Sequence, residues 1–339
     1  MRGSALLWPL IIELAEKTKL SDIHIHSDAP IAYREFGDMI QLEHVVESDH
    51  IRKFLQEILD DEDFAGFIQS KDHDFAIEKD GKRFRVNAFQ ESGKLALILR
   101  RIESDLPNFD DLGLPAYIRT VPTLNTGLVL VTGETGSGKS TTLAALIDVI
   151  NTTKKGHIIT IEDPIEFIHS SKSSVMTQRE VGRDTKSFNN ALKAALREDP
   201  DVILVGELRD VETISLALTA AETGHLVFGT LHSNSAPSTI NRIIDVFPPA
   251  QQGQVQSQLA SSLRCVLTQR LLKTIDKPGR VAAFELMICN NAIQSLIREN
   301  KIFQIANSMQ MGKAEGQLLM DNSLKDLISQ KRIDPSDGA

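Results

Sequence analysis

Hydrophobic and polar residues alternate in short runs over the first third of the chain. The segment Ile23 to His26 has an apolar side chain at every second position, and Phe84 to Phe89 and Leu95 to Leu99 are further strand-like runs. One stretch has helical spacing instead, with its apolar side chains on a single face: Ile51, Phe54, Leu55, Ile58 and Leu59. The pattern predicts a small α+β domain over residues 1–102.

Residues 103–122 interrupt this pattern. Pro107, Pro115 and Pro122 occur there together with Gly113, and apolar runs are few. A residue that precedes proline is biased away from the helical region, so these positions break regular elements. The segment is therefore predicted to be a linker with a short helical piece.

Longer apolar runs alternate with helical segments from residue 123 to the C-terminus. Four of these runs are continuous enough to be buried strands: Leu128 to Val131, His157 to Ile161, Val202 to Val205, and Leu226 to Leu231. Continuous apolar strands between helices predict a largely parallel sheet that is covered on both faces. Residues 123–339 are thus expected to form an α/β domain with a helical C-terminal region, and ligands of such sheets bind at the carboxyl ends of the strands.

The first of these strands runs into the pattern G-x-x-x-x-G-K-[ST], which is the phosphate-binding loop of nucleotide-hydrolysing enzymes. The predicted nucleotide contacts are Gly133, Glu134, Thr135, Gly136, Ser137, Gly138, Lys139, Ser140 and Thr141. Backbone N–H groups and the start of the next helix bind the phosphates of ATP, Lys139 reaches the terminal phosphates, and the Ser140 hydroxyl lies on Mg²⁺. The alternative is an ordinary glycine-rich turn, which the flanking strand and helix disfavour.

The later strands end in ionisable residues. The second run ends in Glu162-Asp163-Pro164-Ile165-Glu166, and Glu166 is the candidate for orienting the attacking water. Glu207 follows the third run and is the candidate for the magnesium side of the site, together with Ser140. His232 follows the fourth run and is expected to contact the γ-phosphate or a catalytic carboxylate. An exposed acidic turn and a structural histidine are the alternatives.

Arginines gather on two strands of the N-terminal domain. Arg83 and Arg85 lie on one face of a strand, and a second strand ends in Arg100-Arg101. They form either a solvated face or a set of guanidinium groups for a phosphate that another molecule supplies. Arg85 and Arg100 are the candidates for such a catalytic arginine.

Composition narrows the class of protein. The chain has 339 residues and a formal net charge of -9, which argues against sequence-independent binding of nucleic acid. Only Cys265 and Cys289 are present, so neither a zinc site nor a disulfide framework is indicated. The apolar run near the N-terminus is too short to cross a bilayer.

The motifs taken together resemble those of secretion ATPases. Four segments are similar to the Walker A, Asp box, Walker B and His box of that superfamily: Gly133 to Ser140, Ile161 to Phe167, Leu204 to Asp210, and Ala221 to His232. Within it the chain is most similar to the PilT and PilU type of pilus retraction ATPase. The segment Ala292 to Glu299 resembles that family's C-terminal retraction motif, with departures at Gln294 and Ser295.

The resemblance implies a RecA-like ATPase core behind a PAS-like N-terminal domain, ATP and Mg²⁺ as cofactors, and a homohexamer. It also implies a cytoplasmic motor at the inner membrane, docked on a pilus platform protein and acting alone or with a paralogous pilus ATPase to retract the pilus. Two alternatives stay open: an assembly or export ATPase of type II or type IV secretion, and an accessory subunit that does not hydrolyse ATP. The absence of a four-cysteine zinc pattern favours retraction over assembly.

Overall fold

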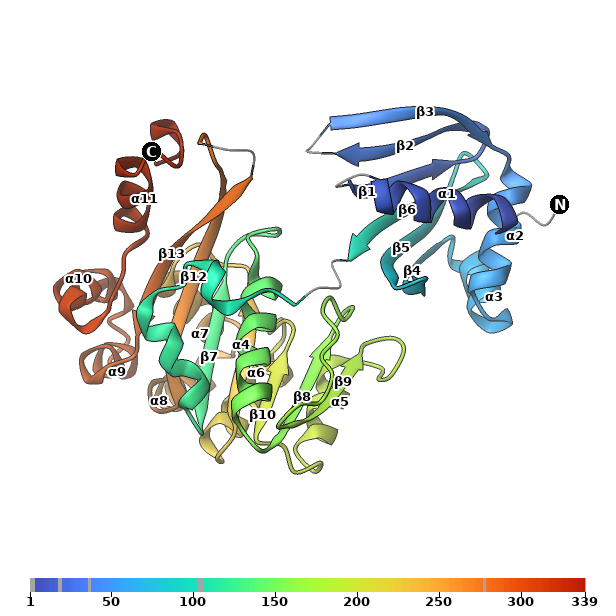
Figure 1. The fold of residues 1–339 in the computed structure, drawn as a ribbon. Helices are drawn as coiled ribbons and strands as arrows, with labels where there is room; N and C mark the ends of the chain where they lie inside the picture. The colour runs from blue at the N-terminus through green and yellow to red at the C-terminus, as the bar shows by residue number, and fades with distance from the viewer. Residues whose placement is uncertain (1–3, 18–19, 36–37, 103–105, 277–278, 339) are drawn as a thin grey trace. The chain divides into compact units, whose positions relative to one another are not determined.

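The computed structural model describes residues 4–17, 20–35, 38–102, 106–276 and 279–338. The chain forms two compact units, Met1–Asp105 and Leu106–Ala339 (Figure 1).

The N-terminal unit is an antiparallel sheet with its helices on one face. Its six strands lie in the order β3-β2-β1-β6-β5-β4. The strands are β1 (Leu20–His26), β2 (Ala29–Glu35), β3 (Asp38–Val46), β4 (Asp72–Lys79), β5 (Lys82–Glu91) and β6 (Lys94–Ile102), and the helices are α1 (Ser4–Lys17), α2 (Ser48–Ile58) and α3 (Asp61–Ser70). Ile23 and Val86 pack with Ile11 and Phe54 of the helices in one buried cluster. Because side chains alternate across a strand, the other face receives the polar residues, Arg85 among them.

The second unit is a seven-stranded sheet in the order β13-β12-β7-β11-β10-β8-β9. All neighbouring strands are parallel except β13, which runs antiparallel to β12. The strands are β7 (Gly127–Thr132), β8 (His157–Glu162), β9 (Val175–Glu180), β10 (Val202–Val205), β11 (Leu226–Leu231), β12 (Leu263–Lys273) and β13 (Arg280–Ile288). The α+β unit and the parallel sheet confirm the predicted fold class.

Helices cover both faces of this sheet, because its strands are apolar on both sides. Val129 and Val131 pack toward α4 (Lys139–Thr153), whereas Leu128 and Leu130 pack toward the opposite layer. That layer contains α5 (Phe188–Ala195), α6 (Val211–Glu222), α7 (Ala236–Asp245), α8 (Pro249–Ser262), α9 (Asn291–Arg298) and α10 (Ile305–Met311). The last α-helix, α11 (Met320–Ser329), packs on β13. Short 3₁₀ helices complete the unit: η1 (Phe109–Leu112), η2 (Ala116–Thr123), η3 (Ile302–Gln304), η4 (Gly312–Glu315) and η5 (Pro335–Gly338).

Most of the segment predicted to be a linker is instead a packed part of the second unit. Residues 106–123 lie in the second unit, and Leu114, Ile118 and Val121 are buried in the same cluster as α4. Their spacing of three or four residues places them along one side of the chain, so η1 and η2 form a cover over α4 in spite of the prolines. Residues 103–105 lie outside the described residues.

Candidate nucleotide site

The loop between β7 and α4 is held open by glycine. Gly133 and Gly138 have φ values of 140° and 90°, in the left-handed region that side chains rarely adopt. A Cβ atom on Gly133 would lie 2.4 Å from the Gln269 carbonyl oxygen and 2.6 Å from Ser137 Oγ. The predicted contacts Gly133 to Gly138 therefore form the turn itself, and Lys139, Ser140 and Thr141 begin α4.

The lysine of this loop bonds to the loop's own carbonyl groups. Lys139 Nζ donates to the carbonyl oxygens of Gly133 at 2.8 Å and Glu134 at 2.9 Å. Burial lowers the pKa of Lys139, while the carboxylates of Glu207 and Glu166 act in the opposite direction. Both predicted catalytic carboxylates are thus close enough to interact with the lysine charge.

The loop also fits a bound anion. Within the described part of the chain, Ser137 Oγ is buried without a hydrogen-bond partner. A buried hydroxyl without a partner is costly unless a ligand or a water molecule satisfies it. Together with a cation and the N-terminus of a fifteen-residue helix, α4, this fits the phosphates of a nucleotide.

The ends of β10 and β11 bring two predicted residues together. Glu207 Oε1 lies 3.6 Å from His232 Nε2, and Glu207 Oε2 lies 2.6 Å from Arg209. The carboxylate of Glu207 is only 16% exposed, whereas His232 is 38% exposed. Arg242 Nη1 donates to the His232 carbonyl at 2.7 Å, which ties the histidine segment to α7. The pairing of Glu207 with His232 is the arrangement expected for residues that share one nucleotide site.

The end of β8 carries a carboxyl group, that of Glu162, with a raised pKa. Glu162 Oε1 accepts hydrogen bonds from Thr160 Oγ1 at 2.7 Å and from Gln178 Nε2 at 3.4 Å. Burial raises the pKa of Glu162 to about 7, in spite of these donors and of the backbone N–H of Glu166, which also bonds to it. Glu162 therefore serves to hold the loop that carries the exposed Glu166.

Strand β9 supplies further anchors for this loop. Gln178 Nε2 donates to the Phe167 carbonyl at 2.9 Å, and Gln178 Oε1 accepts the backbone N–H of His169 at 2.7 Å. Glu180 Oε2 accepts the backbone N–H of Ile165 at 3.1 Å. Gln178 and Glu180 are two residues apart on one strand and so face the same side.

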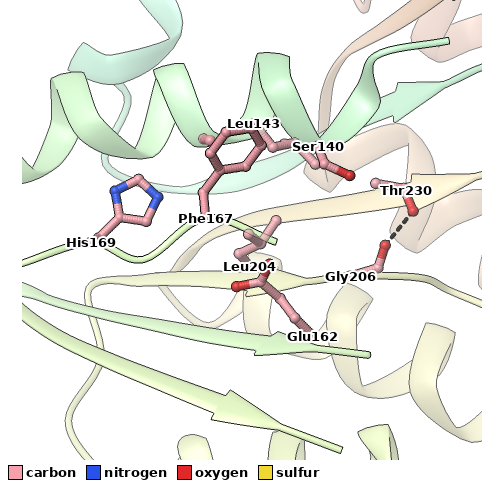
Figure 2. A pocket seen from close by; sticks show the side chains of 9 residues that line it. Ser140, Leu143, Glu162, Phe167, His169, Leu204, Gly206 and Thr230 are labelled. Carbon is pink, nitrogen blue, oxygen red and sulfur yellow. Dashed lines mark hydrogen bonds between the residues drawn. The ribbon is translucent and has the colours of Figure 1, made fainter. Parts of the chain in front are cut away.

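A small pocket lies between this loop and the start of α4 (Figure 2). It is lined by Ser140, Leu143, Ala144, Glu162, Phe167, His169, Leu204, Gly206 and Thr230. Its volume of about 40 Å³ is enough for one or two water molecules. The pocket connects the candidate magnesium ligand Ser140 with the Glu162 network.

The two candidate arginines belong to the N-terminal unit, where both are paired. Arg85 Nε lies 3.1 and 3.0 Å from the two carboxylate oxygens of Asp74, and Arg100 Nε lies 2.8 Å from Asp22 Oδ1. Arg85 and Arg100 are direct partners across β5 and β6. Two like charges side by side are tolerated because each has its own carboxylate.

Sequence reasoning missed three kinds of contributor: Gln178 and Glu180, Arg209, and Gln269. Arg209 lies two positions after Glu207 in the sequence, within the segment Leu204 to Asp210. The others act through contacts between strands, for which the sequence offers little signal beyond polar residues inside apolar runs.

Among the described residues no three His, Cys, Asp or Glu side chains are grouped as metal ligands, and no helix is long and apolar enough to cross a membrane.

The chain is similar to known proteins over nearly its whole length. A profile described as type II/IV secretion system protein matches residues 6–332. The type IV pilus retraction ATPase PilT of Pseudomonas aeruginosa is 47% identical over 325 residues, which cover 95% of this chain and 94% of that protein. The type IV pilus ATPase PilU of the same organism is 37% identical over 315 residues, or 92% of this chain and 82% of PilU. A solved structure of the pilus retraction motor PilT with bound ADP matches with a TM-score of 0.90 at 47% identity and covers 97% of this chain and 94% of that one.

Proposed function

Because the chain belongs to the type II/IV secretion system protein family, we propose that it is a motor ATPase whose hydrolysis of ATP powers retraction of a type IV pilus. The observation that carries this proposal is the phosphate loop with Lys139 at its centre, within the electrostatic reach of Glu166 and Glu207. The resemblance to retraction ATPases over 95% of the chain supports the mechanical role.

The roles of the residues follow from their positions. Lys139 exchanges its bonds to the Gly133 and Glu134 carbonyls for phosphate oxygens. Glu166 orients and partly deprotonates the attacking water, and its loop is held in place by Glu162. Mg²⁺, when bound, neutralises charge on the phosphates, and Ser140 and Glu207 are the residues that would hold it. His232, beside Glu207, reports the state of the site to α7.

The assembly is proposed as a homohexamer with head-to-tail contacts. Arg85 and Arg100 of one subunit would then serve the nucleotide of the next, where an arginine finger raises the rate by several orders of magnitude. To do so, each must leave its present carboxylate, Asp74 or Asp22. The partners proposed are the inner-membrane platform protein of the pilus and a paralogous pilus ATPase, at the cytoplasmic face of the inner membrane.

Identity favours the PilT type over the PilU type, at 47% against 37%. The alternatives are an assembly or export ATPase and an accessory subunit without hydrolysis. The intact Lys139, Ser140, Glu166 and Glu207 weigh against the accessory subunit.

ATP turnover by the purified protein tests the proposal, with Lys139→Ala as the inactive comparison. We expect magnesium-dependent release of phosphate from the wild type and loss of it in the variant. The variant should keep its fold, because the lysine bonds to the loop and not to the core. Absence of turnover in the wild type would favour the accessory role, and equal turnover in both would refute the phosphate-loop assignment.

A further inference from the structure

Gln269 is a buried polar residue placed against the phosphate loop. It lies on β12, next to β7, and is 1% exposed. Its Nε2 donates to the Ser137 carbonyl at 2.7 Å, and its Oε1 accepts from Thr142 Oγ1 at 3.1 Å. The side chain thus joins the loop to the first turn of α4.

The direction of the amide follows from its partners. A backbone carbonyl can only accept a hydrogen bond, so the NH₂ group must face Ser137 and the oxygen must face the Thr142 hydroxyl. Neither a smaller side chain nor an apolar side chain of similar shape can make both hydrogen bonds. The backbone carbonyl oxygen of Gln269 also packs against the loop, where it leaves no room for a side chain on Gly133.

This bond sets the orientation of one peptide group. The peptide between Ser137 and Gly138 is planar and trans, so its N–H points opposite to its carbonyl. Since the Ser137 carbonyl is held toward β12, the N–H of Gly138 points away from it. Backbone N–H groups of this loop type are the donors to nucleotide phosphates.

We propose that Gln269 is a positioning residue for nucleotide binding: it holds the Ser137 carbonyl toward β12 and thereby presents the Gly138 N–H to a phosphate. This rests on the proposed function, in which residues 133–141 bind the nucleotide. Without Gln269 the buried carbonyl loses its partner, and the peptide is free to turn and satisfy it elsewhere. The nucleotide must then restore the orientation on binding, which weakens its affinity.

The chain offers a matched control for this role. Gln317 is 3% exposed and, like Gln269, is hydrogen-bonded at both ends of its amide: Oε1 accepts the backbone N–H of Ile288 at 2.8 Å, and Nε2 donates to the Ile288 carbonyl at 2.7 Å. It ties the C-terminal segment to β13 and touches no residue of the loop in these bonds. Gln269→Met and Gln317→Met remove comparable buried hydrogen bonds with little change in volume, so a merely structural role predicts the same behaviour for both.

The experiment measures the Kd for ADP with magnesium, together with the thermal midpoint, for the full-length wild type and each variant. We expect both methionine variants to lower the midpoint. Gln269→Met should also raise the Kd roughly ten- to hundredfold, as a lost partner of a buried carbonyl implies, and Gln317→Met should leave the Kd within about twofold of wild type. A wild-type Kd in Gln269→Met, or an equal rise in both variants, would overturn the proposal.

Two further variants complete the test. If Gln269→Met does not fold, Thr142→Val removes the bond that anchors the amide oxygen while keeping the shape; it should raise the Kd about three- to tenfold, and an unchanged Kd counts against the proposal. Lys139→Ala separates the two levels of the argument. If Lys139→Ala binds ADP as tightly as the wild type, the nucleotide does not bind at this loop, and both the proposed site and the role of Gln269 are refuted. If Lys139→Ala binds weakly and Gln269→Met binds normally, only the role of Gln269 is refuted.

Discussion

Replacing Glu162 by glutamine should make the protein more stable at neutral pH. The carboxylate ends β8 beneath the loop of Glu166, and it accepts hydrogen bonds from Thr160 and Gln178. Burial nevertheless raises its pKa to about 7. Glutamine has nearly the same shape and an oxygen that accepts the Thr160 hydroxyl, but it has no charge to desolvate.

The size of the effect follows from the pKa. A rise from 4.5 to about 7 corresponds to about 3 kcal/mol of unfolding free energy. This is an upper figure, because the residue is half-buried and lines a pocket large enough for water. Because the pKa of Glu162 is raised in the folded state, its protonated carboxyl group favours folding. This contribution to the unfolding free energy is complete below pH 4.5 and is lost as the pH rises through about 7. The glutamine variant loses nothing over this range, so its advantage grows with pH.

Thermal unfolding of the nucleotide-free protein at pH 5, 6, 7 and 8 and constant ionic strength measures this advantage. About 1–3 kcal/mol at pH 8 corresponds to about 2–12 °C for a unit of this size, and the difference should fall by more than half at pH 5. A difference between Glu162→Gln and wild type that stays flat from pH 5 to pH 8 refutes the reasoning.

The remaining predictions concern the chemistry of the site. Lys139→Ala should abolish phosphate release by at least about a hundredfold while circular dichroism stays unchanged. Glu166→Gln should bind ATP but hydrolyse it very slowly in single-turnover assays. Glu207→Gln should shift the magnesium dependence of the rate. Normal turnover in Glu166→Gln together with slow turnover in Glu162→Gln would show that Glu162, not Glu166, is the catalytic carboxylate. Arg85→Ala should be inactive alone, yet mixing it with Lys139→Ala should restore activity at roughly a quarter of the interfaces of a head-to-tail ring. Mixed rings confirmed by differently tagged subunits but inactive at every ratio would refute the arginine in trans, as would an active Arg85→Ala.

The parts of the site that sequence predicts are those that are local along the chain. The turn from Gly133 to Gly138 lies between a strand and a helix, so its spacing alone indicates the geometry. Glu207 and His232 each follow an apolar strand, and parallel strands place their carboxyl ends at one edge of the sheet. Their approach to 3.6 Å is therefore a consequence of the strand pattern.

The parts that sequence does not predict depend on contacts between distant segments. Gln269 bonds to a residue 132 positions earlier in the chain, and in the sequence it stands between Thr268 and Arg270, where nothing marks it as a contact of the loop. Strand β9 is only partly buried at the edge of the sheet, so Gln178 lacks the continuous apolar neighbours that identify a core strand. The prolines near Ile118 predict a linker, but burial of apolar side chains against α4 outweighs their local preference.

The hairpin of β12 and β13 connects these distant contacts to one another. Thr268 on β12 lies 2.8 Å from Thr132, the residue before the loop, and is the register partner of Glu285 on β13. Glu285 is 7% exposed, and its carboxylate accepts the backbone N–H of Ala236 at 2.7 Å, at the start of the helix that follows His232. A negative charge at a helix N-terminus is favourable, so this contact fixes α7 to the hairpin. The two strands are paired from Cys265 to Lys273. Thr132, before the loop, and Ala236, at the start of α7, are therefore joined by contacts through the hairpin, in addition to the contact between Glu207 and His232.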